Sequence, residues 1–315
     1  MWKYIESKKS NEFLLSLNLI NCKNEKNYIK TLYSISNNIE KNYKIYKIKK
    51  NNGKYRTIYE PNKILKQIQT NILLNILNNK KISKYATAYH KGISLKDNAI
   101  PHINKKVILK LDIKDFFENI SFLNIYNSSF QIEYFPPSIG ILLTNLCTYD
   151  NHLTQGSPTS AYISNLVMKD FDDELGNWCT SKNISYTRYS DDMTFSGDIN
   201  PNEIIIKVKN MLNKLGLRLN KNKIHVINRS ASQNITGIIV NEKLQVSSKY
   251  RKKIRQEIYY IKKYGLNSHL KNCNIDYKSY LNTLYGKIIY VLQINENDKE
   301  FIEYKKIIKD LKKNV

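Results

Sequence analysis

The chain has 315 residues, enough for two or three subdomains that each bury a core. Lysine and arginine number 51 against 27 aspartates and glutamates, and the formal net charge of +24 favours a polyanionic partner, nucleic acid first. The four cysteines stand far apart without a CxxC pair, which argues against a zinc site or a disulfide framework. No apolar run approaches the roughly 18 residues of a membrane span and no signal peptide is recognisable, so we expect a cytoplasmic protein without a membrane partner.

The charge is unevenly distributed along the chain. Residues 107–200 carry five basic and twelve acidic side chains, whereas the remainder is strongly basic. A codon bias toward lysine would act everywhere and would not leave an acidic centre. The pattern therefore predicts a central segment whose carboxylates have a use, within a surface suited to nucleic acid.

The N-terminal part is polar, and the first regular pattern follows it. Residues 1–45 place Leu and Ile at helical spacing, which predicts one or two short helices, either a binding element or a solvated appendage. Residues 43–59 alternate around Asn51-Asn-Gly53, which predicts a β-hairpin. Its second arm carries Lys54 and Arg56, and these could hold a triphosphate because guanidinium binds phosphate bidentately. Basic hairpins are common on so basic a chain, so this pattern alone is unspecific.

Two stretches place acids where a cation would be useful. The apolar run Val107–Ile113 predicts a buried strand, and Asp112 near its end is costly unless it binds or pairs with something. Two β-prone runs flank Asp191 and Asp192, which predicts a hairpin with both acids at its tip. Adjacent carboxylates repel each other, and their oxygens suit Mg²⁺. The alternative for a bare Asp-Asp pair is an acidic surface turn, unless Asp112 lies on a neighbouring strand.

The remaining segments are mostly helical. Pro61 is expected to begin an amphipathic helix, and the segment Gln155-Gly-Ser-Pro-Thr-Ser160 leads into another from about residue 158 to 179. Gly156 would let the backbone approach a ligand closely. A helix over 201–215, a hairpin over 235–246 and three helices in the tail complete the chain. Tyrosines and lysines interleave at residues 259–264, a composition that suits a groove along a nucleic-acid backbone.

In this order, the motifs resemble those of the reverse transcriptases, and of the retron-type bacterial branch in particular. The resemblance runs from about residue 46 to 292, and its carrying motifs are Leu111-Asp-Ile-Lys-Asp-Phe-Phe117, Gln155-Gly-Ser-Pro-Thr-Ser160 and Tyr189-Ser-Asp-Asp192. The retron signatures are Asn98-Ala-Ile-Pro-His102 and Ile235-Thr-Gly237, with Ile in place of the family's Val. Ser190, Ala161 and Tyr89 replace the usual Ala, Pro and Phe, and none of these changes removes a chemical group that the reaction needs.

The resemblance implies an α+β right-hand polymerase fold with fingers, a palm built on an antiparallel sheet, and a helical thumb. Its expected boundaries are an N-terminal helical extension over 1–45, fingers over 46–106 with 128–152 returning to them, a palm over 107–127 and 153–246, and a thumb over 247–315.

The resemblance also implies an RNA-directed DNA polymerase, a nucleotidyltransferase. Asp112, Asp191 and Asp192 would be catalytic, and with the main-chain carbonyl of Ile113 they would hold two Mg²⁺ ions, Asp192 less directly than the others. Expected nucleotide contacts are Lys54, Arg56, Phe117, Gln155, Gly156 and Lys223. Phe117 would exclude a ribose 2′-OH, and Lys223 would protonate pyrophosphate unless it is only a surface lysine. The signature residues linked to the family's RNA are Asn98, His102, Ile235, Thr236 and Gly237.

The expected partners are dNTPs, a cognate structured noncoding RNA of the msr–msd type with its cDNA, and a separate effector protein. The family primes DNA synthesis from a guanosine 2′-OH, giving a branched RNA–DNA (msDNA) in antiphage defence. Two alternatives remain open: another bacterial defence or mobile-element reverse transcriptase with a different primer, and a catalytically idle RNA-binding scaffold for an effector. Retention of all three acids argues against the scaffold.

Overall fold

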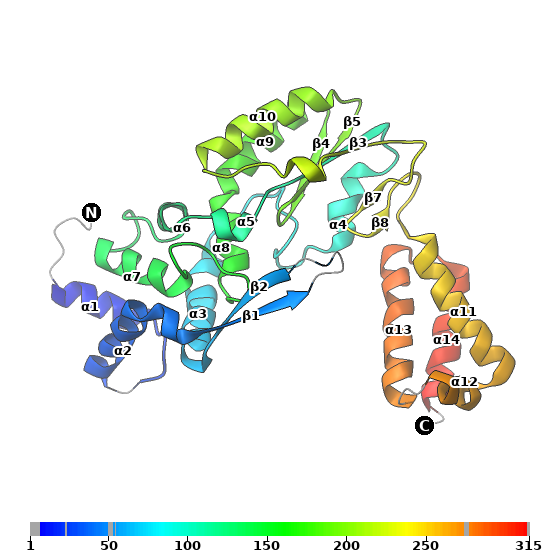
Figure 1. Cartoon of the computed structure of the whole chain (residues 1–315), viewed down its shortest axis with the longest axis horizontal. Coiled ribbons are helices and arrows are strands. Elements are labelled where there is room, and N and C mark those ends of the chain that lie inside the picture. The colour runs from blue at the N-terminus through cyan, green and yellow to red at the C-terminus, as the bar shows by residue number, and fades with distance from the viewer. Residues whose placement is uncertain (1–6, 23, 50–52, 54, 274–276, 314–315) are drawn as a thin grey trace. The chain divides into compact units, whose positions relative to one another are not determined.

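The computed structural model describes residues 7–22, 24–49, 53, 55–273 and 277–313 (Figure 1). The chain divides into two compact units. Unit 1 consists of the chain up to Ile93 together with Leu109–Phe195 and Ile199–Val226, and unit 2 consists of Ser94–Ile108, Ser196–Asp198 and the chain from Ile227 onward. Each unit has its own apolar core.

Unit 1 begins with two helices, α1 (Ser7–Ser16) and α2 (Glu25–Asn37), followed by a short 3₁₀ turn. Helix α2 buries Tyr28, Leu32 and Ile35, and the Tyr28 hydroxyl donates to the carbonyl of Leu14. The N-terminal segment therefore has a packed interior, and the prediction of one or two helices is confirmed.

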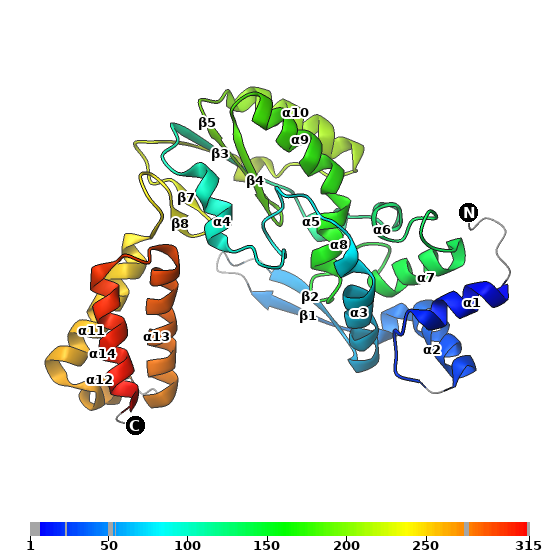
Figure 2. The same ribbon diagram turned by 180° about the vertical axis from the view of Figure 1, so that it is seen from behind.

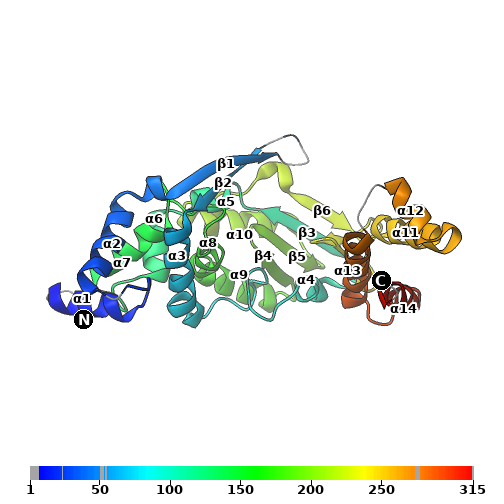
Figure 3. The same ribbon diagram turned by 90° about the horizontal axis from the view of Figure 1, so that it is seen from below.

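The predicted hairpin is present as β1 (Tyr43–Lys49) and β2 (Tyr55–Pro61), paired antiparallel (Figure 3). Asn51, Asn52 and Lys54 of its expected turn lie outside the described residues. Pro61 ends β2 and does not begin the next helix, which corrects the prediction. Asn62 caps α3 (Lys63–Asn75) because its side-chain oxygen accepts from the Leu65 amide at 2.9 Å, and Asn is a preferred cap.

A four-stranded sheet in the order β4-β5-β3-β6 positions the acids. Strand β3 spans Val107–Asp112, β4 Ser185–Tyr189, β5 Asp192–Gly197 and β6 His225–Asn228. The β4–β5 hairpin with acids at its tip is thus confirmed, and β5 is the direct neighbour of β3. Helix α9 (Lys169–Ser181) packs against β4, and α10 (Pro201–Lys214) packs against α9 (Figure 2).

Unit 1 also contains α5 (Phe116–Asn119), α6 (Phe122–Ser129), α7 (Pro137–Cys147) and α8 (Ser160–Val167). The sequence predicts a single helix over 158–179, but the structure has two: α8 starts at Ser160, and the helix is interrupted at Met168 before α9 begins. The apolar spacing continues across Met168, which is itself buried, and so the sequence pattern conceals the break.

Unit 2 contains α4 (Leu95–Ala99), a 3₁₀ turn at Ile100–His102, and a small sheet of β7 (Asn234–Ile235), β8 (Ile238–Ile239) and β9 (Gln245–Val246). Residues 94–106 belong to this unit because α4 contacts β8. The expected fingers boundaries group the same residues with 46–93. Thr236 and Gly237 form a turn with positive φ angles of 45° and 94°, where the sequence suggests a continuous strand.

The tail of unit 2 is helical, as expected, with α11 (Ser248–Tyr264), α12 (Leu266–Cys273), α13 (Tyr277–Ile294) and α14 (Lys299–Lys313). The sequence predicts three of these, and α12 is the additional one. Within the described part of the chain, every helix is too short or too polar to cross a membrane.

Candidate active site

Asp112 and Asp191 lie side by side in unit 1. Asp112 is the last residue of β3, and the following amide of Ile113 donates to the carbonyl of Asp191 at 3.0 Å. Asp191 lies in the turn between β4 and β5, and Asp192 is the first residue of β5. The order of the strands therefore brings together acids that are separated by about eighty residues in the sequence.

Asp112 is buried and already has two side-chain partners. The side-chain amide of Asn220 donates to its Oδ1 at 3.0 Å, and the Lys223 ammonium contacts its Oδ2 at 2.5 Å. Main-chain hydrogen bonds hold this segment in place: the Asn220 amide donates to the Asp112 carbonyl, and the Lys114 amide donates to the Arg218 carbonyl, both at 2.8 Å. Asp112 is thus a buried acid held by Asn220 and by Lys223, and the lysine side chain is itself exposed.

The pKa values of the two turn acids are shifted upward. Burial raises the pKa of Asp191, the neighbouring Asp112 carboxylate raises it further, and Lys223 and Arg56 lower it only in part. Burial also raises the pKa of Asp192, and the charge of Asp191 adds to this. Burial lowers the Lys223 pKa, but its hydrogen bond to Asp112 and the nearby carboxylates outweigh burial and raise it. Excess negative charge at one point is a property of cation sites.

A cleft of about 730 Å³ opens over these acids. Residues of β2, of the loop before α8 and of the Asp191 turn line it. Five of the expected nucleotide contacts line this same cleft: Arg56, Phe117, Gln155, Gly156 and Lys223. Ile113 also lines it, whereas Asp192 is not part of the lining. Lys54 lies outside the described residues.

Gly156 has a role that the sequence does not reveal. Its φ is +124°, and a Cβ atom there would lie 2.5 Å from the carbonyl oxygen of Tyr59. The Tyr59 amide donates to the Gln155 carbonyl at 2.8 Å. Glycine is required at position 156 because the loop before α8 contacts the backbone of β2. The close approach made by Gly156 in this structure is therefore to the chain itself.

The signature residues do not reach the cleft. In unit 2, the Asn98 side-chain amide donates to Thr236 Oγ1 at 3.3 Å, and the His102 Nδ1 lies 2.7 Å from Ser196 Oγ. Asn98, His102 and Ile235 are buried, and burial lowers the pKa of His102 to about 3. These three side chains pack the interior of unit 2, while Thr236 and Gly237 form a turn, and the link of these residues to RNA stays a prediction.

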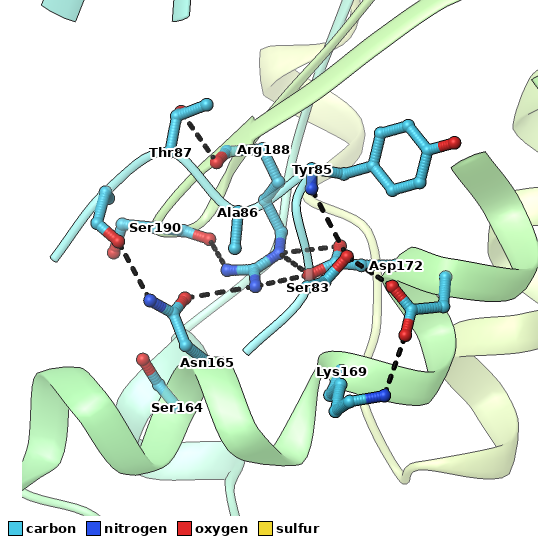
Figure 4. A network of polar contacts seen from close by, with 12 residues as sticks. Ser83, Tyr85, Ala86, Thr87, Ser164, Asn165, Lys169, Asp172, Arg188 and Ser190 are labelled. Atoms are coloured by element: carbon cyan, nitrogen blue, oxygen red, sulfur yellow. Dashed lines mark hydrogen bonds and ion pairs between the residues drawn. The ribbon is translucent and has the colours of Figure 1, made fainter. Parts of the chain in front are cut away.

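A buried polar network contacts Ser190, the residue directly before Asp191 (Figure 4). Arg188 of β4 and Asp172 of α9 are both fully buried, and the guanidinium contacts the carboxylate through Nε and Nη2, the latter at 2.6 Å. Arg188 Nη2 also donates to Asn165 Oδ1 at 3.1 Å, and the Tyr186 hydroxyl donates to Asp172 at 2.8 Å.

Sequence reasoning assigned no role to these network residues or to Asn220. Arg188 stands directly before the Tyr189 motif and Asn165 follows the Gln155 motif, which was the available signal. Nothing in the sequence shows that Asp172, sixteen residues away from Arg188, is its partner.

The donor set fits a hard divalent cation, because Asp112 and Asp191 offer oxygen ligands beside each other and carry unbalanced charge. Among the described residues, no three His, Cys, Asp or Glu side chains already stand together as a metal site. Lys223 occupies one oxygen of Asp112, so an incoming cation would replace its ammonium.

Comparison with known proteins identifies the family. Residues 48–249 match the family described as "Reverse transcriptase (RNA-dependent DNA polymerase)". A foamy viral protease–reverse transcriptase solved with double-stranded DNA superposes with a TM-score of 0.51 at 15% identity, covering 87% of this chain and 39% of that one. The fold and site therefore define a right-hand polymerase of the reverse transcriptase class.

Curated relatives narrow this assignment. Retron Ec83 reverse transcriptase of Escherichia coli is 31% identical over 86% of this chain and 90% of its own length, and the Ec86 enzyme of the same species is 30% identical over 70% of each chain. Retron Mx65 reverse transcriptase of Myxococcus xanthus is 27% identical over 82% of this chain and 63% of its own. The chain belongs to the retron-type bacterial reverse transcriptases. It is an RNA-directed DNA polymerase, and the reaction of its family uses divalent metal ions.

Proposed function

We propose that this polymerase reverse transcribes a cognate structured noncoding RNA, starting from a guanosine 2′-OH and producing a branched RNA–DNA in a retron antiphage system with a separate effector. The observation that carries the polymerase site is the meeting of Asp112 and Asp191 under a cleft lined by Arg56, Gln155 and Phe117. Retron relatives that align over most of the chain support the RNA partner.

In this proposal, Asp112, Asp191 and the Ile113 carbonyl hold two Mg²⁺ ions, with Asp192 acting less directly. The ions, when bound, lower the pKa of the priming hydroxyl and neutralise charge on the triphosphate and the departing pyrophosphate. Asp112 and Asp191 supply fixed negative charge for them. The raised pKa of Asp191 is consistent with a carboxylate that awaits a cation.

Other residues bind and orient the nucleotide. Arg56 is exposed on β2 at the cleft and is suited to bind the triphosphate through its guanidinium fork. Gln155 and Gly156 line the position of the nascent base pair, and the Phe117 ring faces the sugar and excludes a 2′-OH. Lys223 first separates from Asp112, which is possible because the lysine side chain is exposed, and then donates a proton to the departing pyrophosphate.

The test is a reconstitution of the purified protein with the RNA that co-purifies with it, Mg²⁺ and dNTPs. Wild type is expected to make cDNA with a debranching-sensitive 2′–5′ linkage, and Asp191→Asn is expected to make none. cDNA from Asp191→Asn would overturn the site assignment. A linear product from wild type would leave the polymerase intact and replace the priming assignment with a different primer. Undiminished phage protection by an Asp112→Ala variant would favour the idle scaffold.

A further inference from the structure

The turn between β4 and β5, which contains Ser190 and Asp191, has an unusual backbone. Ser190 has a φ of +59°, in the left-handed region that non-glycine residues rarely adopt, and it is directly followed by Asp191. Strain of this kind persists only where the surrounding structure holds it. The question is therefore which groups hold this turn.

Two successive carbonyls of the turn accept hydrogen bonds from two different parts of the chain. Arg188 Nη1 donates to the Ser190 carbonyl at 2.8 Å, and the Ile113 amide donates to the Asp191 carbonyl at 3.0 Å. Figure 4 shows the Arg188 guanidinium between Asp172 and Ser190. Arg188 thus links the buried carboxylate of α9 to the backbone of the residue before Asp191.

The same arginine anchors one wall of the cleft. Its amide donates to the Tyr85 carbonyl and its carbonyl accepts from the Thr87 amide, both at 2.8 Å. Asn165, which accepts from Arg188, donates to the Ala88 carbonyl at 2.8 Å. The next residue, Tyr89, lines the cleft, and its hydroxyl donates to Ser190 Oγ at 3.4 Å.

We propose that Arg188, held by Asp172 and Asn165, is a positioning residue of the polymerase reaction: it fixes the Ser190–Asp191 turn and the Tyr89 wall, so that the Asp191 carboxylate stays beside Asp112. The inference rests on the proposed role of Asp191 in cation binding. Only arginine has a planar fork that can bind a carboxylate, an amide oxygen and a main-chain carbonyl at once. A buried ion pair by itself contributes little net stability, so its use here is to hold the geometry of the site.

The decisive variants separate geometry from folding. Arg188→Met/Asp172→Leu removes both charges, so no unpaired charge stays buried. Arg188→Lys keeps a cation against Asp172 but cannot also reach the Ser190 carbonyl. Tyr186→Phe is the matched control, because it removes a hydrogen bond to Asp172 and leaves every Arg188 contact in place. Thermal unfolding establishes which variants are folded.

Each folded variant is assayed with poly(rA)·oligo(dT), dTTP and a Mg²⁺ titration. We expect kcat to fall by about 10²-fold in both Arg188 variants, the size that a misplacement of about 1 Å produces. The half-saturating Mg²⁺ concentration should rise, and the KM for dTTP should change less than kcat. Without substrates, Tb³⁺ luminescence should report weaker ion binding. Tyr186→Phe should match wild type in all four measured quantities.

Wild-type kcat, Mg²⁺ requirement and Tb³⁺ binding in either folded Arg188 variant would overturn the inference. Failure of both Arg188 variants to fold would also overturn it, because the network would then be needed for the fold itself. Asp191→Asn is measured in parallel. Activity in that variant refutes the proposed cation site, whereas an inactive Asp191→Asn beside fully active Arg188 variants refutes only the positioning role.

Discussion

Two ion pairs in unit 1 use the same chemistry in opposite ways. Asp112 is nearly buried, but its partner Lys223 keeps 56% of its side chain exposed. Asp172 and its partner Arg188 are both 0% exposed. The lysine makes one contact that water, a cation or a phosphate can replace, whereas the arginine contacts several acceptors that no solvent reaches. We therefore call the first pair exchangeable and the second permanent. In the proposed function the exchangeable pair takes part in the reaction, and the permanent pair is part of the framework.

The largest expected effect on stability comes from removing only one partner of the permanent pair, Asp172. Asp172→Leu leaves the Arg188 charge buried without compensation, which should lower the free energy of unfolding by about 3–5 kcal/mol. Urea denaturation measures it, and Asp170→Leu on the same helix, whose side chain is fully exposed, is the control and should change stability little. Equal stabilities of the two variants would remove the distinction between the pairs.

Breaking the exchangeable pair on the acid side should affect activity and spare stability. We expect Asp112→Asn to lower kcat by more than about 10²-fold, because the site loses a cation ligand. Lys223 is exposed, so no charge is left unpaired in the interior. Primer extension and thermal unfolding are measured together, with Glu133→Gln, an exposed acid of unit 1, as the control. A large loss of stability would show that Asp112 belongs to the framework.

Removing the lysine of the exchangeable pair should have a smaller effect. Lys223→Met should reduce kcat by about 10²-fold, the low end of the range for general acid catalysis, and change stability by less than about 0.5 kcal/mol. Lys221→Met, two residues earlier in the same 3₁₀ turn, is the control. Single-turnover extension rates decide the matter: identical rates for the two variants would make Lys223 an ordinary surface lysine.

His102, whose ring contacts Ser196 in unit 2, adds a buried polar contact that can be compared with the two ion pairs through its pH dependence. The pKa of His102 is about 3 when folded and about 6.5 when unfolded, so its contribution is complete above pH 6.5 and is lost as the pH falls toward 3. The slope should be at most about 1.4 kcal/mol per pH unit in this window. Equilibrium unfolding of His102→Gln should show a shallower slope than that of His225→Gln, an exposed histidine. Parallel slopes would contradict a buried neutral His102.

Local patterns were read correctly where the periodicity was strong. The hairpins β1–β2 and β4–β5 and strand β3 follow from alternation and turn residues, and helix α10 follows from its helical spacing. The resemblance also identified the acids that meet at the cleft. Local features that lack a periodicity signal were missed: the Asn62 cap, the break at Met168 and the turn at Thr236.

Long-range polar partners were beyond sequence reasoning for a physical reason. Arg188 lies in a strand that reads as a buried β-segment, and a buried arginine is too costly to expect without knowing its partner. Its partner Asp172 belongs to an acidic run on α9, in which the other acids are exposed or half-buried. Only the packing of α9 against β4 selects Asp172 from its neighbours.

The contact between Gly156 and Tyr59 limits how the β1–β2 hairpin can bend. The Tyr59 backbone is clamped to the Gln155–Gly156 loop, so the inner end of β2 moves only together with the floor of the cleft. A displacement of β2 at Tyr59 would break this hydrogen bond, whereas Arg56 lies three residues away from it along the strand. A side chain at position 156 would displace the Tyr59 backbone, and with it the base of the hairpin.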